Sequence, residues 1–181
     1  MSPDIATTLR EIARGKRSLI VFALPRLAGK TTVLRAVLAE RPPESPLLTL
    51  AQDGNDIDEL IKKSAGGYLV IPEIAKGAAM PGYIWGADVR RIFTAAKKSS
   101  LAATLHADGP EDAFAQICEG CAVPDAEASK IEFAVHLRSI GRWEEPTRRV
   151  VQSVNAIESI RDGKPQMKLL HRWDEQNDRF I

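Results

Sequence analysis

The chain has 181 residues, 44% of them hydrophobic and 27% charged, which is an ordinary composition for a globular protein with a sizeable core. Its net charge of +1, from 25 basic and 24 acidic residues, favours neither nucleic acid nor a membrane surface as a partner. No apolar run approaches the roughly 18 residues that span a bilayer, and the start does not resemble a signal peptide. We therefore expect a cytoplasmic protein of one domain, with no transmembrane segment and no clear nucleic-acid signal.

The first predicted elements are a helix, a strand and a second helix. Residues 4–14 place Ile5, Leu9 and Ile12 on one face, which predicts an amphipathic helix. The apolar run 18–23 predicts a strand, and the apolar spacing in 33–38 predicts the next helix. Strand, tight loop and helix is the context that a phosphate-binding loop requires.

The loop between this strand and helix, residues 24–32, carries P-loop chemistry. Lys30 would reach the β- and γ-phosphates, the Thr31 hydroxyl would be a metal ligand for Mg²⁺, and backbone amides would face the phosphates from a helix N-terminus. The loop departs from the pattern G-x-x-x-x-G-K-[ST] because Leu24 stands at the first glycine. Our candidate nucleotide-binding residues are Pro25, Leu27, Ala28, Gly29, Lys30, Thr31 and Thr32.

Two strands and a short helix are predicted next. Residues 47–50 predict a short strand, and a helix follows over 57–61. Residues 67–73 are apolar without alternation, which is typical of a parallel strand covered on both faces. This run ends in Glu73, where an acid at a strand tip would be the second NTPase motif. Pro72 lacks a donor for the ladder, so we expect strand pairing to end there.

The middle of the chain continues the alternation of helix and strand. Residues 75–86 are rich in glycine and alanine and predict a surface loop, and 89–96 predict a helix. Residues 100–106 predict a fourth strand, which ends in His106. Another helix should begin near Pro110, because proline suits the first helical turn.

The last part of the chain is β-rich. Alternation in residues 131–138 predicts a strand with one solvated face. Two apolar runs, 148–160 and 164–173, are joined by Asp-Gly at 162–163, a hairpin signal.

Four strands that alternate with helices, followed by antiparallel strands, predict an α/β fold with a mainly parallel sheet. We assign residues 1–140 to the core and residues 141–181 to a C-terminal β-hairpin extension of the same domain.

The two cysteines, Cys118 and Cys121, form a C-x-x-C pair. A zinc site would need four ligands, and no second Cys or His pair has suitable spacing. A thioredoxin-like motif would begin a helix, whereas this pair lies where a helix should end. We interpret the thiols as structural or incidental.

Taken in order, these motifs resemble the secretion ATPase superfamily, the hexameric motors of type II and type IV secretion, type IV pili and Flp/Tad pili. Residues 103–117 are similar to its His box, Thr-[Leu/Ile]-His-[Ala/Thr]-Asn, followed by a helix that begins near Pro. Residues 68–74 resemble its Walker B strand, and 25–32 resemble its P-loop, Gly-Pro-Thr-Gly-Ser-Gly-Lys-Thr-Thr. Residues 133–138 resemble the strand after the His box.

The resemblance implies a RecA-like P-loop NTPase core in which the His106 strand lies between the Walker A and Walker B strands. Glu73 would orient or activate the attacking water, and His106 would contact the γ-phosphate, so both are candidate catalytic residues. ATP and Mg²⁺ would be the ligands. A ring of six copies and the proteins of a secretion or pilus machine would be the partners.

Departures from the family pattern leave more than one function open. Leucines replace glycines at Leu24 and Leu27, Ala75 replaces the arginine after the Walker B glutamate, and the acidic Asp box is reduced to Asp53. The chain is thus either a minimal Mg²⁺-dependent ATPase or a non-hydrolysing relative that serves as a regulatory or assembly module. A small-molecule P-loop kinase is a third alternative, although the loop 75–86 lacks the arginines of a kinase lid.

Overall fold

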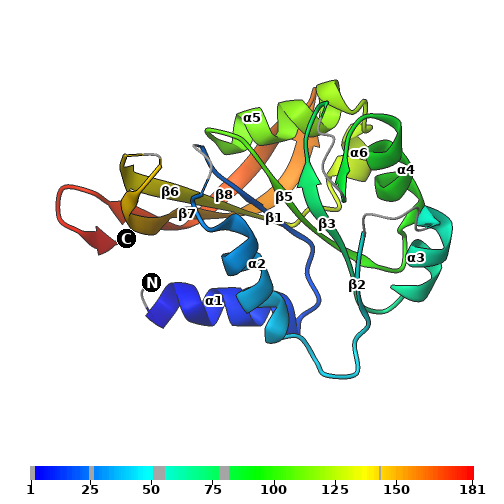
Figure 1. The fold of residues 1–181 in the computed structure, drawn as a ribbon, viewed down its shortest axis with the longest axis horizontal. Coiled ribbons are helices and arrows are strands. Elements are labelled where there is room, and N and C mark those ends of the chain that lie inside the picture. Colours follow the sequence, from blue (N-terminus) through cyan, green and yellow to red (C-terminus); the bar gives the residue numbers. More distant parts are fainter. Residues whose placement is uncertain (1–2, 25–26, 51–55, 78–81, 143) are drawn as a thin grey trace.

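The computed structural model describes residues 3–24, 27–50, 56–77, 82–142 and 144–181. Its strands form one mixed sheet in the order β2-β3-β5-β1-β6-β7-β8-β9, and β4 also pairs with β3 (Figure 1). The strands are β1 (Leu19–Phe22), β2 (Leu47–Thr49), β3 (Tyr68–Ile74), β4 (Tyr83–Ile84), β5 (Ser100–Leu105), β6 (Phe133–Gly141), β7 (Pro146–Arg161), β8 (Lys164–Asp174) and β9 (Arg179–Phe180).

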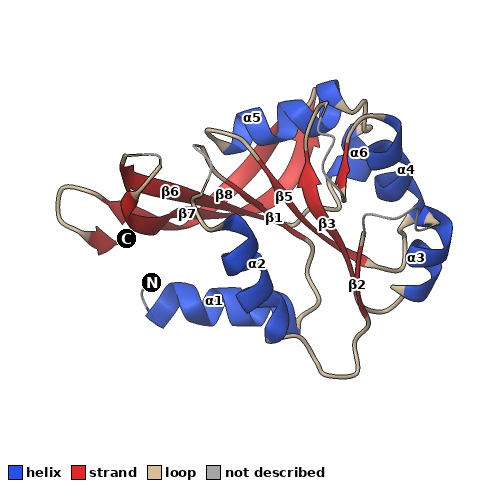
Figure 2. Cartoon of the chain, viewed as in Figure 1, coloured by secondary structure: helices blue, strands red, loops and turns tan. Residues whose placement is uncertain are grey.

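Helices cover both faces of the parallel part of the sheet, with α1 and α2 on one face and α3 to α6 on the other (Figure 2). The helices are α1 (Pro3–Arg14), α2 (Lys30–Ala39), α3 (Ile57–Lys63), α4 (Ala87–Ala95), α5 (Pro110–Ala115) and α6 (Asp125–Ala128), and a π-helical segment, η1 (Gln116–Gly120), follows α5. None of the helices in the described ranges is both long and apolar enough to span a membrane.

Strand β1 shows why this sheet lies in the centre of the molecule. Its four residues are all buried. Leu19 and Val21 point to the core under α1 and α2, whereas Ile20 and Phe22 point to the core on the opposite face. Because side chains alternate along a strand, a strand buried on both faces must be apolar throughout.

The predicted fold class is confirmed. Strand β1 pairs in parallel with β5 on one side and β6 on the other, and β3 pairs in parallel with β5. The strand that ends before His106 therefore lies between the strands of the P-loop and of Glu73, as the resemblance implied. The β6–β7 and β7–β8 pairs are antiparallel.

One expectation about β3 is wrong. Pairing does not end at Pro72, because β3 continues to Ile74 and pairs there with Leu105 of β5. The register shifts between Ile71 and Ile74, and this irregularity accommodates a proline that cannot donate to the ladder. Glu73 also pairs with Tyr83 of β4, so the predicted surface loop contains a short strand.

The C-terminal hairpin forms as predicted. Asp162 and Gly163 both have positive φ, +51° and +71°, which suits the tight turn between β7 and β8. Strand β6 runs to Gly141 and pairs with both β1 and β7, so hydrogen bonding is continuous across the proposed boundary at residue 140. The division into core and extension stays a prediction.

Candidate functional site

The carboxyl ends of β1, β3 and β5 bring three predicted motifs to one cleft of about 880 Å³. Parallel strands end at the same edge of a sheet, so the loop after β1, Glu73 near the end of β3 and His106 after β5 meet there. The described residues that line this cleft are Leu27, Ala28, Gly29, Lys30, Thr31, Thr32, Val33, Glu73, Ala75, Lys76, Gly77, Tyr83, His106 and Arg149.

Among the described residues of the loop before α2, two have left-handed backbone conformations, Leu27 at φ +67° and Gly29 at φ +88°. Gly29 adopts this conformation readily, but Leu27 carries a Cβ and is destabilised there by about 1–2 kcal/mol. The Leu27 side chain is 57% exposed, so packing does little to offset this cost. Pro25, a predicted binding residue, lies outside the described residues, as does Asp53.

Lys30 begins α2 and contacts both predicted catalytic residues. Its Nζ lies 3.2 Å from Nδ1 and 3.3 Å from Nε2 of His106, and 3.7 Å from Oε2 of Glu73. His106 Nε2 lies 3.8 Å from Oε1 of Glu73. The Lys30 and Glu73 side chains are only 8% and 5% exposed, so this ion pair is weakly screened by solvent. The structure thus brings all three residues together.

Thr104 on β5 fixes the Glu73 carboxylate. Its hydroxyl lies 2.7 Å from Glu73 Oε2 and also reaches the carbonyl of Pro72. The other carboxylate oxygen, Oε1, is buried and has no hydrogen-bond partner among the described residues. A buried carboxylate oxygen without a donor is costly, so a change that brings a donor to Oε1 would be favourable. Thr104 lies within the segment that resembles the His box, and the sequence alone assigns it no role.

Arg149, on β7, is a cleft residue that sequence reasoning missed. Its Nε donates to the carbonyl oxygen of Leu27 over 2.7 Å. No local pattern could have found it, because 122 positions separate it from Leu27 and only the β6–β7 register brings it to the loop. Among the described residues, the charged side chains that line the cleft are three basic ones, Lys30, Lys76 and Arg149, and one acidic one, Glu73. This excess of positive charge favours an anion.

Thr31 and Thr32, in the first turn of α2, are exposed and line the cleft. Ala28 is buried and supplies only backbone. Within the described part of the chain, no group of three or more His, Cys, Asp or Glu side chains is arranged to hold a metal ion.

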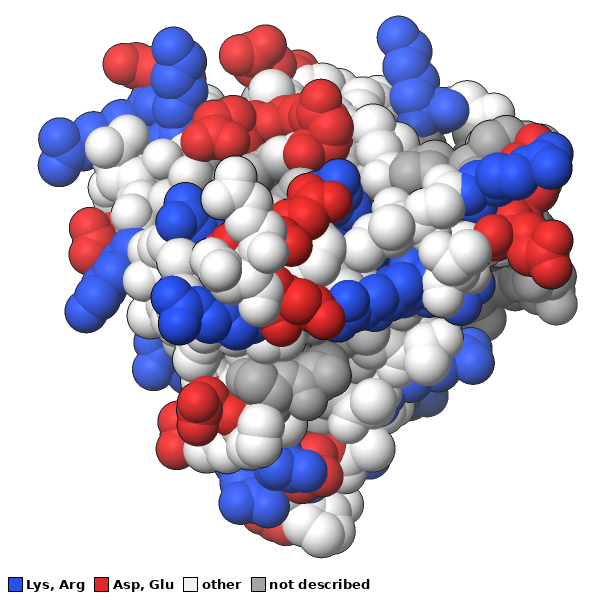
Figure 3. Space-filling view, turned by 90° about the vertical axis from the view of Figure 1, so that its left-hand side faces the viewer, with Lys and Arg blue, Asp and Glu red and all other residues white. Residues whose placement is uncertain are grey.

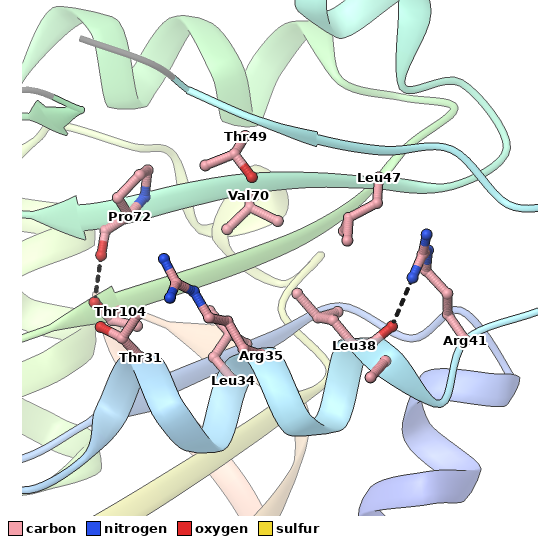
Figure 4. Close-up of a pocket in the computed structure, with 11 residues that line it drawn as sticks. Thr31, Leu34, Arg35, Leu38, Arg41, Leu47, Thr49, Val70, Pro72 and Thr104 are labelled. Carbon is pink, nitrogen blue, oxygen red and sulfur yellow. Dashed lines mark hydrogen bonds between the residues drawn. The ribbon is translucent and has the colours of Figure 1, made fainter. Parts of the chain in front are cut away.

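A second cavity of about 330 Å³ lies behind Thr31, between α2 and the strands β2 and β3 (Figure 4). Thr31 lines both this cavity and the cleft. Leu34, Leu47 and Val70 make most of its wall apolar, and the Arg35 side chain reaches across it.

The remaining histidines and cysteines lie away from the cleft lining. His136 stacks on Phe22 with ring centroids 5.0 Å apart, and burial lowers its pKa. His171 hydrogen-bonds to the Thr8 hydroxyl over 2.8 Å. Burial raises the pKa of the Cys118 thiol to about 11, and nearby acidic side chains add to the effect, so it stays protonated at neutral pH and unreactive.

No protein-family model matches the sequence, and comparison with curated proteins gives no significant match. Solved structures do match. The VirB11 ATPase from the Brucella suis type IV secretion system, in complex with sulphate, aligns with a TM-score of 0.61 and 16% identity over 83% of this chain and 51% of that one. The Legionella pneumophila ATPase DotB aligns with a TM-score of 0.53 and 11% identity over 97% of this chain and 50% of that one. The chain spans about half the length of each and, as its motifs predicted, has the fold of the secretion ATPases.

Proposed function

We propose that this chain binds ATP together with Mg²⁺ and hydrolyses it. The observation that carries the proposal is the contact of Lys30 with both Glu73 and His106 at the start of a P-loop helix. A lysine beside a phosphate-binding loop and a carboxylate that can orient the attacking water are groups that phosphoryl transfer to water uses. The fold shared with two ATPases, one of them in complex with sulphate, supports the same conclusion.

In this proposal each residue has a separate task. The amides before α2 and the Lys30 ammonium hold the β- and γ-phosphates. Glu73 Oε1, which has no described donor, accepts a hydrogen bond from the attacking water, and Thr104 keeps the carboxylate oriented. His106 lies beside the γ-phosphate. Mg²⁺, when bound through the Thr31 hydroxyl and phosphate oxygens, neutralises charge on the phosphates.

Nucleotide binding must rearrange the contacts of Lys30. Its ammonium contacts Glu73 and His106 in this structure, and it must turn towards the phosphates to hold them. That exchange frees the Glu73 carboxylate from its counter-ion. The active arrangement is therefore formed only when nucleotide is present.

The alternative is a domain that binds nucleotide without turnover. Leu27 in a strained conformation and Ala75 in place of the family's arginine favour it. Assembly into a ring, partner proteins of a secretion or pilus machine, and a cytoplasmic location stay predictions from the resemblance. Light scattering with and without nucleotide tests the ring.

Calorimetric titration with ATP and Mg²⁺, with a phosphate-release assay, tests the proposal. We expect saturable binding that Lys30→Ala weakens about tenfold or more, since a hydrogen bond to a charged group is lost. Lys97→Ala removes an exposed lysine that follows α4 and does not line the cleft, so this variant should bind ATP as the wild type does. Glu73→Gln should keep binding and lower turnover by about 100-fold or more, the usual contribution of a general base.

The outcomes separate the alternatives. A wild type without saturable binding contradicts the whole proposal. Binding with no turnover supports the non-hydrolysing alternative. Turnover that survives Glu73→Gln unchanged would show that Glu73 is not the catalytic base.

A further inference from the structure

Arg149 reaches the nucleotide cleft from the side opposite to Glu73 and His106. In the sheet, β3 and β5 lie on one side of β1, and β6 and β7 lie on the other. The phosphate loop follows β1 and therefore lies between the two groups. Lys30 contacts Glu73 and His106 on one side, and Arg149 contacts the carbonyl of Leu27 on the other.

The arginine side chain extends across the loop. Its Cδ would lie only 3.5 Å from a Cβ placed on Gly29, so its aliphatic part covers the residue that precedes α2. Its Nε is used in the 2.7 Å bond to Leu27, and a guanidinium has further N–H donors on its two Nη atoms. Arg149 is exposed and lines the cleft together with Lys30, so a ligand on the loop can reach its guanidinium.

We propose that Arg149 binds the α-phosphate of the nucleotide. The inference rests on the proposed function, in which Lys30 holds the β- and γ-phosphates and the γ-phosphate lies beside Glu73. The chain of phosphates must then run along the loop away from Glu73, and the α-phosphate comes to the side where Arg149 lies. A guanidinium suits this role, because its planar fork matches the oxygens of a phosphate.

This assignment separates binding from hydrolysis. Arg149 contributes to affinity for the shared part of ATP and ADP, whereas Glu73 and His106 act at the γ-phosphate, which only ATP has. Loss of the Arg149 side chain should therefore lower the affinity for ATP and the affinity for ADP by the same factor. The expected factor is about tenfold, the value of one charge-assisted hydrogen bond.

Arg149 could instead act only by holding the strained loop, and Leu27→Gly distinguishes the two roles. Glycine adopts positive φ without the penalty that leucine carries, so the loop would no longer need the restraint. If Arg149 binds the α-phosphate, adding Arg149→Ala to Leu27→Gly should still lower the affinity for both ATP and ADP about tenfold, because the same charge-assisted hydrogen bond is lost. If it only restrains the loop, the double variant should bind as Leu27→Gly does.

The test is calorimetric titration of the full chain and its variants with ATP and with ADP, each with Mg²⁺. The set is wild type, Arg149→Ala, Arg149→Lys, Leu27→Gly, Leu27→Gly/Arg149→Ala and Lys30→Ala, with Arg161→Ala as the control. Arg161 is an exposed arginine at the other end of β7, and its removal should leave both affinities unchanged. Arg149→Lys keeps the positive charge but loses the planar guanidinium, so it should lower the affinity for ATP and ADP by a smaller factor. It also provides the test if Arg149→Ala does not fold.

The proposal is supported if Arg149→Ala lowers the affinities for ATP and ADP equally, and if it does so in the Leu27→Gly background as well. An effect on ATP alone, no effect of Arg149→Ala, or its disappearance in the Leu27→Gly background overturns it. If Lys30→Ala abolishes binding while Arg149→Ala changes nothing, the proposed function stands and only the Arg149 assignment is wrong. If the wild type binds neither nucleotide, both are wrong.

Discussion

Tyr68 shows how one buried side chain joins the start of the fold to the sheet. Its hydroxyl group contacts the carbonyl oxygens of Arg17 over 2.9 Å and of Ile12 over 3.3 Å. These carbonyls belong to the end of α1 and to the segment that leads into β1. Burial, together with the nearby charge of Glu132, raises the pKa of Tyr68 well above its usual value. The hydroxyl is therefore held in its neutral form while the chain is folded.

We expect Tyr68→Phe to lower the free energy of unfolding by about 1–2 kcal/mol, because buried carbonyls lose their donor. Above pH of about 10 the unfolded tyrosine ionises and the folded one does not, so wild-type stability should fall as pH rises. The Tyr68→Phe variant should not show this part of the loss of stability at high pH. Urea unfolding between pH 7 and 11 measures both effects.

The chain's other tyrosine, Tyr83, is half-buried and provides the control. Tyr83→Phe should keep the alkaline loss of stability. If Tyr68→Phe loses stability with pH as steeply as the wild type does, Tyr68 does not titrate as we describe.

At the level of elements, the start of β3 depends on a close approach to the chain before β2. The amide of Tyr68 donates to the carbonyl of Pro46 over 2.8 Å. A Cβ on the preceding residue, Gly67, would lie 2.0 Å from that same oxygen. Both atoms belong to backbone, so neither can move without disturbing the β2–β3 pair.

We expect Gly67→Ala to cost about 2–3 kcal/mol of stability, as overpacking against backbone does. Gly66 is the matched control, because it has φ +80° and open space around its missing Cβ. Gly66→Ala should lose only about 1 kcal/mol through backbone strain. Equal losses in urea unfolding would contradict the steric explanation.

Local patterns predicted most elements, because a run buried on both faces or an Asp-Gly turn carries its own signal. They failed at Pro72, where the neighbours β4 and β5 keep the strand paired past a residue that should end it. In the site, the motifs pointed to Lys30, Glu73 and His106. The contributions of Thr104 and Arg149 depend on strand order and register, which no local pattern contains.

At the scale of the whole molecule, the C-terminal strands complete the core. Val150, Val151 and Val154 of β7 are buried, and the last two pack into the core under α1 and α2. On the face seen in Figure 3, basic and acidic side chains are interspersed without a large area of one sign. This face therefore gives no electrostatic footprint for nucleic acid.

We expect a chain that ends at residue 140 not to unfold cooperatively. Removing β7 to β9 forfeits the burial of these three valines, about 5 kcal/mol in total, which is a large part of the stability of a domain. Thermal unfolding followed by circular dichroism compares it with the full chain. A cooperative transition in the shortened chain would mean that residues 1–140 form an independent unit.

The strands at the two edges of the sheet determine how the molecule can meet its neighbours. On one edge, β2 and β4 follow each other along β3 and are three and two residues long. On the other, β9 pairs with the end of β8, and the rest of β8 carries Lys164, Pro165 and Lys168. Short strands, lysine and proline all hinder the addition of a foreign strand. Copies of this chain should therefore associate through side-chain surfaces rather than by extending one another's sheets, which protects concentrated solutions from fibrous aggregation.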